Sequence, residues 1–253
     1  MAEGGEHSPL EQFMIKPILE IQIGQYDVSL TNSSLFMILA TAGITAFLTL
    51  SMSGRAMVPG RWQNLAEMSY EFVADIVRST SGSEGMKYFP LVFSLFMYVL
   101  FCNLLGMMPY SFTVTSHIVV TFGLALVAIT AVLIIGFARN GLGFLKLFAP
   151  SGVPPFLLIL IIPIEVISFL TRPVSLAVRL FANMLAGHTM LKVFAGFVVG
   201  LVSLGGFGSL SAVVPLFASV AITGLEFLVA FLQAFIFAML TSIYLNDALH
   251  PSH

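Results

Sequence analysis

The sequence predicts an all-α integral membrane protein with about five spanning helices and one amphipathic surface helix. Of the 253 residues, 58% are hydrophobic and only 9% are charged, whereas soluble domains average roughly 45–50% and about 25%. So few charged side chains cannot cover the surface of a soluble domain. The apolar residues also gather in long runs with few charges, and a spanning helix needs about 20 such residues.

Residues 1–34 are expected to form a polar segment outside the membrane. Acidic side chains outnumber the single basic one, Lys16: they are Glu3, Glu6, Glu11, Glu20 and Asp27. No positively charged stretch leads directly into an apolar core, so we expect no cleavable signal peptide. The sequence leaves open whether this segment is ordered on the surface or frayed. Residues 35–253 are expected to form a single transmembrane helical domain.

Five apolar runs are expected to span the membrane: Leu35–Met52, Phe89–Met108, Ile118–Phe137, residues 153–202 and residues 212–245. Pro109 ends the second run, and a predicted loop, Ala138–Pro150, follows the third. A loop rich in Gly and Ser, Ser203–Ser209, is predicted between the last two runs. These last two runs exceed 30 residues, more than a helix needs to cross the membrane.

Residues 61–80 have a different pattern. Apolar side chains recur there at helical spacing: Trp62, Leu65, Phe72, Val73 and Ile76. Charged side chains such as Glu67 and Arg78 occupy other positions, so the segment is amphipathic and too polar to span. We expect a helix that lies on the membrane surface or packs on neighbouring spans.

The loop charges predict an orientation. Basic side chains gather in two connecting regions, residues 53–88 and 138–150: they are Arg55, Arg61, Arg78, Lys87, Arg139 and Lys146. The positive-inside rule places both regions in the cytoplasm, or in the matrix of a mitochondrion. The N-terminus is then outside and the C-terminus inside, which five crossings satisfy.

Several function classes are excluded by charge, cysteine and motif content. The net charge is −2 and the basic residues are scattered, which excludes a nucleic-acid partner. The single cysteine, Cys102, excludes a disulfide framework and a Cys-rich metal site, and we expect neither a metal nor a cofactor. The sequence contains no GxxxxGK[ST] loop, so we expect no nucleotide site.

Polar side chains interrupt the last two apolar runs. They are Glu165, Arg172, Arg179, Asn183, His188 and Lys192 in the first run, and Glu226 and Gln233 in the second. An ionised group at membrane depth costs about 2.5–3.5 kcal/mol even on the lenient insertion scale, so it usually faces a partner or a water-filled path. Arg179 has no acidic residue within one turn of its own helix. Because Arg stays charged when partly desolvated, it suits a partner that comes and goes.

A titratable pair is expected where the last two helices meet. If they form an antiparallel hairpin, His188 and Glu226 lie at similar distances from the turn and can be neighbours. By the same count, Gln233 is level with about residue 179 and is expected to face the guanidinium. Glu165 lies toward the inner face. These residues together suggest a proton path with a positive charge in it.

Alternative interpretations stay open at this point. Arg179 can be a structural residue that snorkels to the interface, and His188 can be a hydrogen-bonded core histidine. A secondary transporter is disfavoured because the chain has no convincing internal repeat. An intramembrane enzyme needs a nucleophile–base pair or a metal cluster, and neither GxSxG nor HExxH occurs. A scaffold would leave the buried charges unexplained.

Three segments resemble the subunit a family of the F-type ATP synthases. The segment Ser175–His188 (SLAVRLFANMLAGH) is similar to the family's arginine signature, Glu226–Leu245 to its last helix, and Asn103–Pro109 to its asparagine–proline segment. The segments occur in the family's order, and the resemblance covers the chain from about residue 30 onward.

This resemblance implies a proton-translocating stator subunit that couples proton flow to rotation of a ring of subunit c. It also implies that the last two helices are long, strongly tilted and wrapped against that ring, which fits runs of over 30 residues. Arg179 matches the essential arginine that faces the ring between two offset half-channels. The matches to the outer path are Asn103, Asn183, His188, Glu226 and Gln233. Glu165 matches an acid near the inner exit, and His117 a polar position at the outer mouth. The implied partners are the c ring, the peripheral stalk of subunit b, the rest of the complex and membrane lipid, with ATP chemistry on other subunits.

The order of the titratable pair suggests a source. Some bacterial members of the family carry the acid and the histidine in exchanged positions, whereas His188 with Glu226 resembles alphaproteobacterial and mitochondrial members. We expect the bacterial inner membrane, with the mitochondrial inner membrane as the alternative. Nothing in the chain resembles a sodium cage of oxygen ligands, so the proton is the expected ion.

Overall fold

The structure is a computed structural model that describes residues 13–20, 22–23, 26–27, 29–54, 59–108, 111–149 and 154–250. Within these ranges, five helical segments are long and apolar enough to cross a membrane, judged by length and composition. The predicted all-α membrane class is therefore confirmed. Pro109, which was expected to end the second run, lies outside the described residues.

The described part of the N-terminal segment leads into the first span through short strands. Strand β1 (Pro17–Leu19) pairs antiparallel with β4 (Leu30–Thr31), and β2 (Gln22–Ile23) pairs with β3 (Tyr26–Asp27). Helix α1 (Asn32–Ser53) starts three residues earlier than the predicted run. Thr31 and Ser34 cap it reciprocally, since each hydroxyl accepts a hydrogen bond from the other residue's backbone N–H, which satisfies two free donors.

Helix α2 (Arg61–Gly85) is the amphipathic helix and extends beyond residue 80. Val73 and Val77 are completely buried where α2 packs on α3 and α7. Of the two expected arrangements, a helix on the membrane surface or one packed on neighbouring spans, the structure shows the second. Trp62, the first apolar residue of this pattern, is 69% exposed near the start of α2.

The next two spans are joined by short helical pieces. The turn η2 (Met86–Tyr88) leads into α3 (Phe89–Gly106), and η3 (Val114–Ser116) precedes α4 (Ile118–Asn140). The predicted loop after the third span is wrong in kind, because η4 (Gly141–Phe148) is helical. Its Phe144 is completely buried against the backbone of α4, where Gly136 has no side chain to obstruct the ring.

The last two spans form an antiparallel hairpin. Helix α5 (Pro155–Ser203) has 49 residues and α7 (Val213–Leu249) has 37, so they are about 74 and 56 Å long at 1.5 Å per residue. The predicted loop between them contains a short helix, α6 (Phe207–Ser211). The chain reverses at Gly205 and Gly206, whose φ angles of +66° and +48° are strained for residues with a Cβ.

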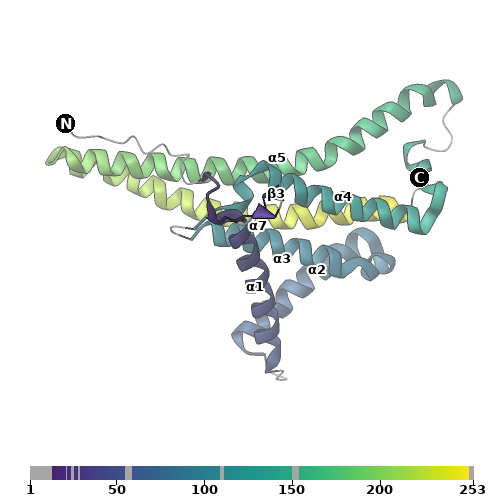
Figure 1. The fold of residues 1–253 in the computed structure, drawn as a ribbon, viewed down its shortest axis with the longest axis horizontal. Coiled ribbons are helices and arrows are strands. Elements are labelled where there is room, and N and C mark those ends of the chain that lie inside the picture. Colours follow the sequence, from purple (N-terminus) through teal and green to yellow (C-terminus); the bar gives the residue numbers. More distant parts are fainter. Residues whose placement is uncertain are drawn as a thin grey trace.

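Two prolines lie inside α5. Pro163 and Pro173 each remove a backbone donor and crowd the preceding turn. Both are in the first half of the helix, the part that bends away from the other spans in Figure 1. This bend agrees with the usual cause of helix kinks.

Helix α7 is the centre of the bundle. It packs against α2, α3, α4 and α5, and its buried Ala234, Phe237 and Ala238 belong to the main apolar core. Polar contacts fix its C-terminal end: the Ser81 hydroxyl donates to the Ser242 carbonyl at 2.8 Å, and the Asn140 amide donates to the Ala248 carbonyl at 2.6 Å. The end of α7 is therefore held by α2 and α4.

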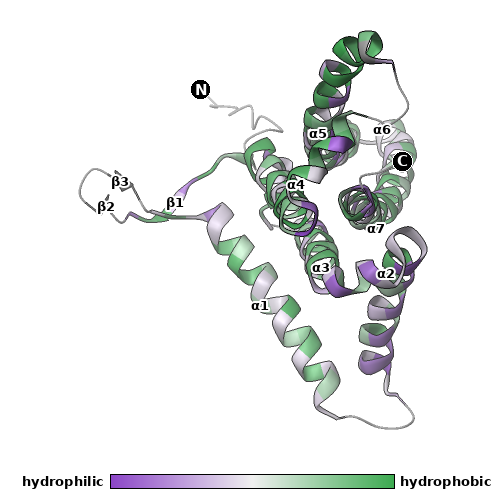
Figure 2. Ribbon diagram, turned by 90° about the vertical axis from the view of Figure 1, so that its right-hand side faces the viewer, coloured by the Kyte–Doolittle hydropathy of each residue, from purple (hydrophilic) through white to green (hydrophobic). Residues whose placement is uncertain are grey.

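The first span runs in a different direction from the later ones. Figure 1 shows α5 and α7 side by side along the longest dimension of the molecule, with α1 crossing them. In Figure 2 the helices α3, α4, α5 and α7 are seen nearly end-on, whereas α1 is seen from its side. Helices that point in such different directions cannot all stand upright in one membrane.

Gly136→Ala is expected to destabilise the contact between α4 and η4. The added methyl group would lie 2.5 Å from the ring of Phe144, which is buried, so overpacking should cost about 1–3 kcal/mol. Thermal unfolding of the purified chain in detergent should show a lower midpoint than that of the wild type.

Gly123→Ala is the matched control on the same helix. Nothing described lies within 4 Å of its added methyl group, and Ala favours a helix over Gly by up to about 1 kcal/mol. Its midpoint should equal or exceed that of the wild type. Equal midpoints for the two variants would contradict the packing of η4 on α4.

Candidate functional site

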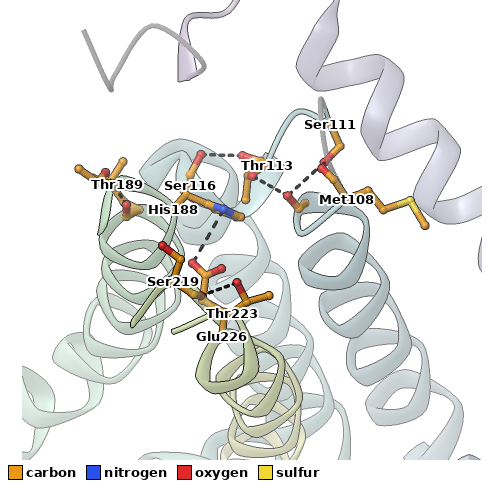
Figure 3. Close-up of polar contacts among 11 residues, drawn as sticks. Met108, Ser111, Thr113, Ser116, His188, Thr189, Ser219, Thr223 and Glu226 are labelled. Atoms are coloured by element: carbon orange, nitrogen blue, oxygen red, sulfur yellow. Dashed lines mark hydrogen bonds and ion pairs between the residues drawn. The ribbon is translucent and has the colours of Figure 1, made fainter. Parts of the chain in front are cut away.

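Helices α5 and α7 bring His188 and Glu226 together (Figure 3). The Nδ1 atom of His188 is 3.9 Å from Oε1 of Glu226, and their side chains are only 12% and 9% exposed. The neighbourhood expected from the hairpin is confirmed for this pair. The separation is slightly too long for a direct hydrogen bond, so a small approach or one intervening water would connect the two groups.

A glycine creates the space for the carboxylate. A Cβ at Gly187 would overlap Oε1 of Glu226, so the carboxylate rests directly on the backbone of α5. Small residues allow such close approach between membrane helices. Gly187 is therefore a positioning residue for Glu226.

Several buried polar side-chain atoms of α3, α5, α7 and the segment before α4 have no hydrogen-bond partner among the described residues. They are Nε2 of His188, both carboxylate oxygens of Glu226, Oδ1 of Asn103, Oγ1 of Thr115 and Nε2 of His117. Buried polar groups are normally paired with protein or ordered water. A group of unpaired donors and acceptors is the environment that buried water occupies.

A cleft leads from the surface of the molecule to His188. It has a volume of about 640 Å³ and is lined by the start of α1, the end of α3, the segment that follows it, and α5. His188 and Lys192 are its lining residues with titratable side chains. Solvent in this cleft therefore has access to the imidazole of His188.

Hydroxyl groups surround the pair in Figure 3, and sequence reasoning did not find them. The Ser116 hydroxyl donates to the Thr113 carbonyl at 2.6 Å, and the Thr223 hydroxyl donates to the Ser219 carbonyl at 2.8 Å. Each oxygen keeps lone pairs that can accept a hydrogen bond from water. The sequence feature that could have revealed them is the polar run before the third span. It contains five side chains with hydroxyl or imidazole groups: Ser111, Thr113, Thr115, Ser116 and His117.

Two buried amide side chains, Asn103 and Gln233, lie near the same part of α7 as Glu226. Asn103 of α3 is completely buried and donates through Nδ2 to the carbonyl of Ala230, at 3.2 Å. Ala230 is one turn after Glu226, and the buried Gln233 follows it on the same helix. The polar residues predicted on these two helices therefore lie close together in the interior.

His117 lies at the entrance to α4 and is half-buried. Its ring stacks on that of Phe112, with centroids 5.0 Å apart and an interplanar angle of 17°. Burial lowers the pKa of His117 below its ordinary value of 6.5, because desolvation disfavours the charged imidazole. The ring is therefore neutral at pH 7 and can accept a proton.

Arg179 and Asn183 lie on α5, nine and five residues before His188. Both are exposed, and neither makes a hydrogen bond or ion pair with another described residue. The expected contact between Arg179 and Gln233 is not formed as a hydrogen bond. Beside these residues is an apolar groove of about 600 Å³, lined by Phe181, Ala182, Leu185, Ala186, Thr189, Met190, Val193, Phe194 and Phe197.

Glu165 lies apart from the other polar residues. It is half-buried and precedes Arg179 by 14 residues, about 21 Å along α5. Between them, Arg172 pairs with Asp247 of α7 at 3.2 Å and stacks over the ring of Tyr244 at 4.9 Å. The sequence did not reveal Asp247 as a partner, although the hairpin count places residue 172 near the C-terminal end of α7.

Comparisons with known proteins agree on one family. A family model described as "ATP synthase A chain" matches residues 34–246. A protein named ATP synthase subunit a from Mesorhizobium japonicum is 60% identical over 245 residues, 97% of each chain. Those from Allorhizobium ampelinum and a Chelativorans strain are each 62% identical over 245 residues, 97% of this chain and 98% of theirs.

The chain belongs to the ATP synthase A chain family. The family match covers the segments that carried the resemblance, so that expectation is confirmed. These A chain relatives are alphaproteobacterial, which agrees with the order of the His188–Glu226 pair. They give no support to the mitochondrial alternative.

Gly187→Ala is expected to displace Glu226 from its position in this A chain. The added methyl group would overlap the carboxylate, and overpacking of this kind costs about 1–3 kcal/mol. The thermal midpoint of the purified chain in detergent should fall by several degrees.

Gly196→Ala on the same helix is the control, because nothing described lies within 4 Å of its added methyl group. Its midpoint should stay at or above the wild-type value. If Gly187→Ala also left the midpoint unchanged, the carboxylate would not rest on the α5 backbone as described.

Proposed function

We propose that this chain is the proton-translocating stator subunit of an F-type ATP synthase. It delivers protons to a ring of subunit c through an outer half-channel and releases them through an inner one, with Arg179 between. Membership of the ATP synthase A chain family supports this function. The observation that carries the path is the buried His188–Glu226 pair at the end of an open cleft.

The outer half-channel begins at the cleft. A proton arriving there reaches the imidazole of His188 and then the carboxylate of Glu226, 3.9 Å away. The unpaired buried atoms around the pair favour water molecules that carry the proton between groups. Asn103 of α3 and Gln233 of α7 extend the path, Asn183 of α5 lies near its end, and His117 lies at its mouth.

The exposed position of Arg179 supports a partner outside this chain. A guanidinium that faces lipid is expensive, and no described residue pairs with it. A carboxylate on a neighbouring subunit would neutralise it, and the adjacent apolar groove fits the convex surface of a helical ring. Because the ring turns, each of its carboxylates contacts Arg179 only for a time. The guanidinium must therefore have no permanent ion-pair partner in its own chain.

Coupling follows from one fixed positive charge. When a ring carboxylate approaches Arg179, opposite-charge attraction favours its ionised form, so the proton leaves into the inner half-channel. The same charge repels a hydronium ion and prevents a direct leak between the half-channels. Both effects are large because the surroundings screen charge poorly. Glu165, half-buried toward the other end of α5, is the proposed acid at the inner exit.

The crossing of α1 with the later helices supports the expected tilt. If α1 stands upright in the bilayer, then α5 and α7, which run across it (Figure 1), are steeply inclined. Their lengths of about 74 and 56 Å exceed the roughly 30 Å hydrocarbon core, which tilting accommodates. Inclined helices present a long face to the ring and separate the two half-channels laterally.

The assembly and location follow from the same assignment. We infer that the c ring contacts the Arg179 face and that subunit b links this chain to the peripheral stalk, with ATP chemistry on other subunits. The alphaproteobacterial relatives support the bacterial inner membrane. Residues 1–34 are placed outside as a polar segment, and residues 35–253 as one transmembrane domain with the C-terminus inside.

Arg179→Ala is expected to abolish coupled proton transport while the complex still assembles. Without the fixed charge, nothing drives the proton off the ring carboxylate, so ATP-driven pumping into inverted vesicles should fall at least about tenfold. Pumping is measured with a pH-sensitive dye, and assembly by the amount of complex in the membrane. Arg61→Ala, which removes an exposed arginine at the start of α2, is the control and should pump normally. Near wild-type pumping by Arg179→Ala would contradict the proposal.

Exchanging the pair tests the proton path. His188→Glu leaves two acids and Glu226→His leaves two imidazoles, so each single variant should lose most pumping. The double variant restores one acid and one imidazole and should pump at least about threefold better than either single variant, a coupling in the usual range for residues in contact. A double variant no better than the singles would show that the two groups do not act as a pair.

A further inference from the structure

Lys192 is a charged residue with no role in the proposed proton path. It lies on α5 four residues after His188, so the two side chains project from the same face about 6 Å apart along the axis. Both line the outer cleft. Of the described residues that line this cleft, Lys192 alone carries a fixed charge.

The charge of Lys192 is not neutralised by a neighbour. The side chain is exposed and makes no hydrogen bond or ion pair with another described residue. Glu226, the acid of the pair, instead packs on Gly187, which lies five residues before Lys192. The lysine is therefore nearer to the imidazole than to the carboxylate.

The other groups that face the pair come from each element packed around it. Helix α7 contributes Glu226, and the segment before α4 contributes His117, which stacks on Phe112. Helix α1 contributes the neutral Asn32, and the segment after α3 contributes the hydroxyls of Ser111 and Thr113. Arg179 lies nine residues before His188, about 13 Å along α5. The backbone of Lys16 is hydrogen-bonded to Asn32, but Lys16 does not itself line the cleft. Lys192 is thus the positive charge that lines the cleft together with His188.

A positive charge in this position acts on the proton at one point of its path. It repels a proton held on His188 more than it affects one held on Glu226, because it lies closer to the imidazole. A proton entering from the cleft is therefore passed on to the carboxylate, and entry requires a higher proton concentration than it would without the charge.

We propose that Lys192 sets the outer pH at which the His188–Glu226 pair takes up protons. It is a positioning residue that acts through the field at His188, and the inference rests on the proposed proton path. The field is effective because the cleft leads into a partly buried site, where screening is weaker than in bulk water.

The test measures ATP synthesis by the whole complex in liposomes as a function of the outer pH. The pH on the ATP-forming side and the membrane potential are held constant, and the midpoint of the outer-pH profile is recorded. Lys192→Gln and Lys192→Met should both move the midpoint upward by about 0.5–1 pH unit, since a proton then binds at a lower concentration. Lys192→Arg keeps the charge and should leave the midpoint in place.

Lys87→Gln is the control for surface charge in general. Lys87 is exposed in η2 and does not line the cleft, so its loss should not move the midpoint. Unchanged midpoints in both neutral Lys192 variants, or a shift in Lys192→Arg or Lys87→Gln as large as that in Lys192→Gln, would overturn the inference. Arg179→Ala is measured alongside: if it still synthesises ATP, the proposed function fails, whereas its inactivity with unshifted Lys192 variants removes only the role of Lys192.

Discussion

The close approach of α5 and α7 at Gly187 is the constraint on which the site depends. At this point the carboxylate of Glu226 rests on the backbone of Gly187, which has no side chain. The next residue, His188, brings its imidazole to 3.9 Å from the same carboxylate. A larger residue would separate the helices and leave two buried polar groups apart, each without a partner. The α5–α7 hairpin therefore places an acid and a base together inside an otherwise apolar bundle.

The polar contacts of the bundle divide into two kinds. Near the C-terminal end of α7 they are paired: Arg172 with Asp247, Arg139 with Glu84, and Asn140 with the Ala248 carbonyl. Around His188 and Glu226 the polar atoms are buried without described partners. Paired groups fix the helices relative to one another, whereas unpaired ones favour bound water. The contacts near the C-terminal end of α7 therefore stabilise the packing, and the groups around His188 and Glu226 suit a water-filled proton path.

Buried and exposed positions of α5 lie close together around Arg179. Leu176, Leu180 and Met184 are buried, whereas Arg179 and Asn183 are exposed. The buried positions thus contact the chain's own interior, and the exposed ones are free for a neighbouring subunit. Because most side chains at both kinds of position are apolar, hydropathy along α5 does not distinguish them.

The membrane class, the five long helices and the residues of the titratable pair were determined by the sequence alone. Apolar runs of this length are stable in lipid and not in water, and the rare charges within them need a partner or a water-filled path. Only the tertiary structure decided which neighbours those residues have. It paired Arg172 with Asp247, left Arg179 without a hydrogen bond to Gln233, turned a predicted loop into η4 and gathered hydroxyl groups from η3 around His188. Such contacts depend on the rotation and crossing of helices, and an apolar sequence constrains neither, since in lipid most faces of a helix are equally acceptable.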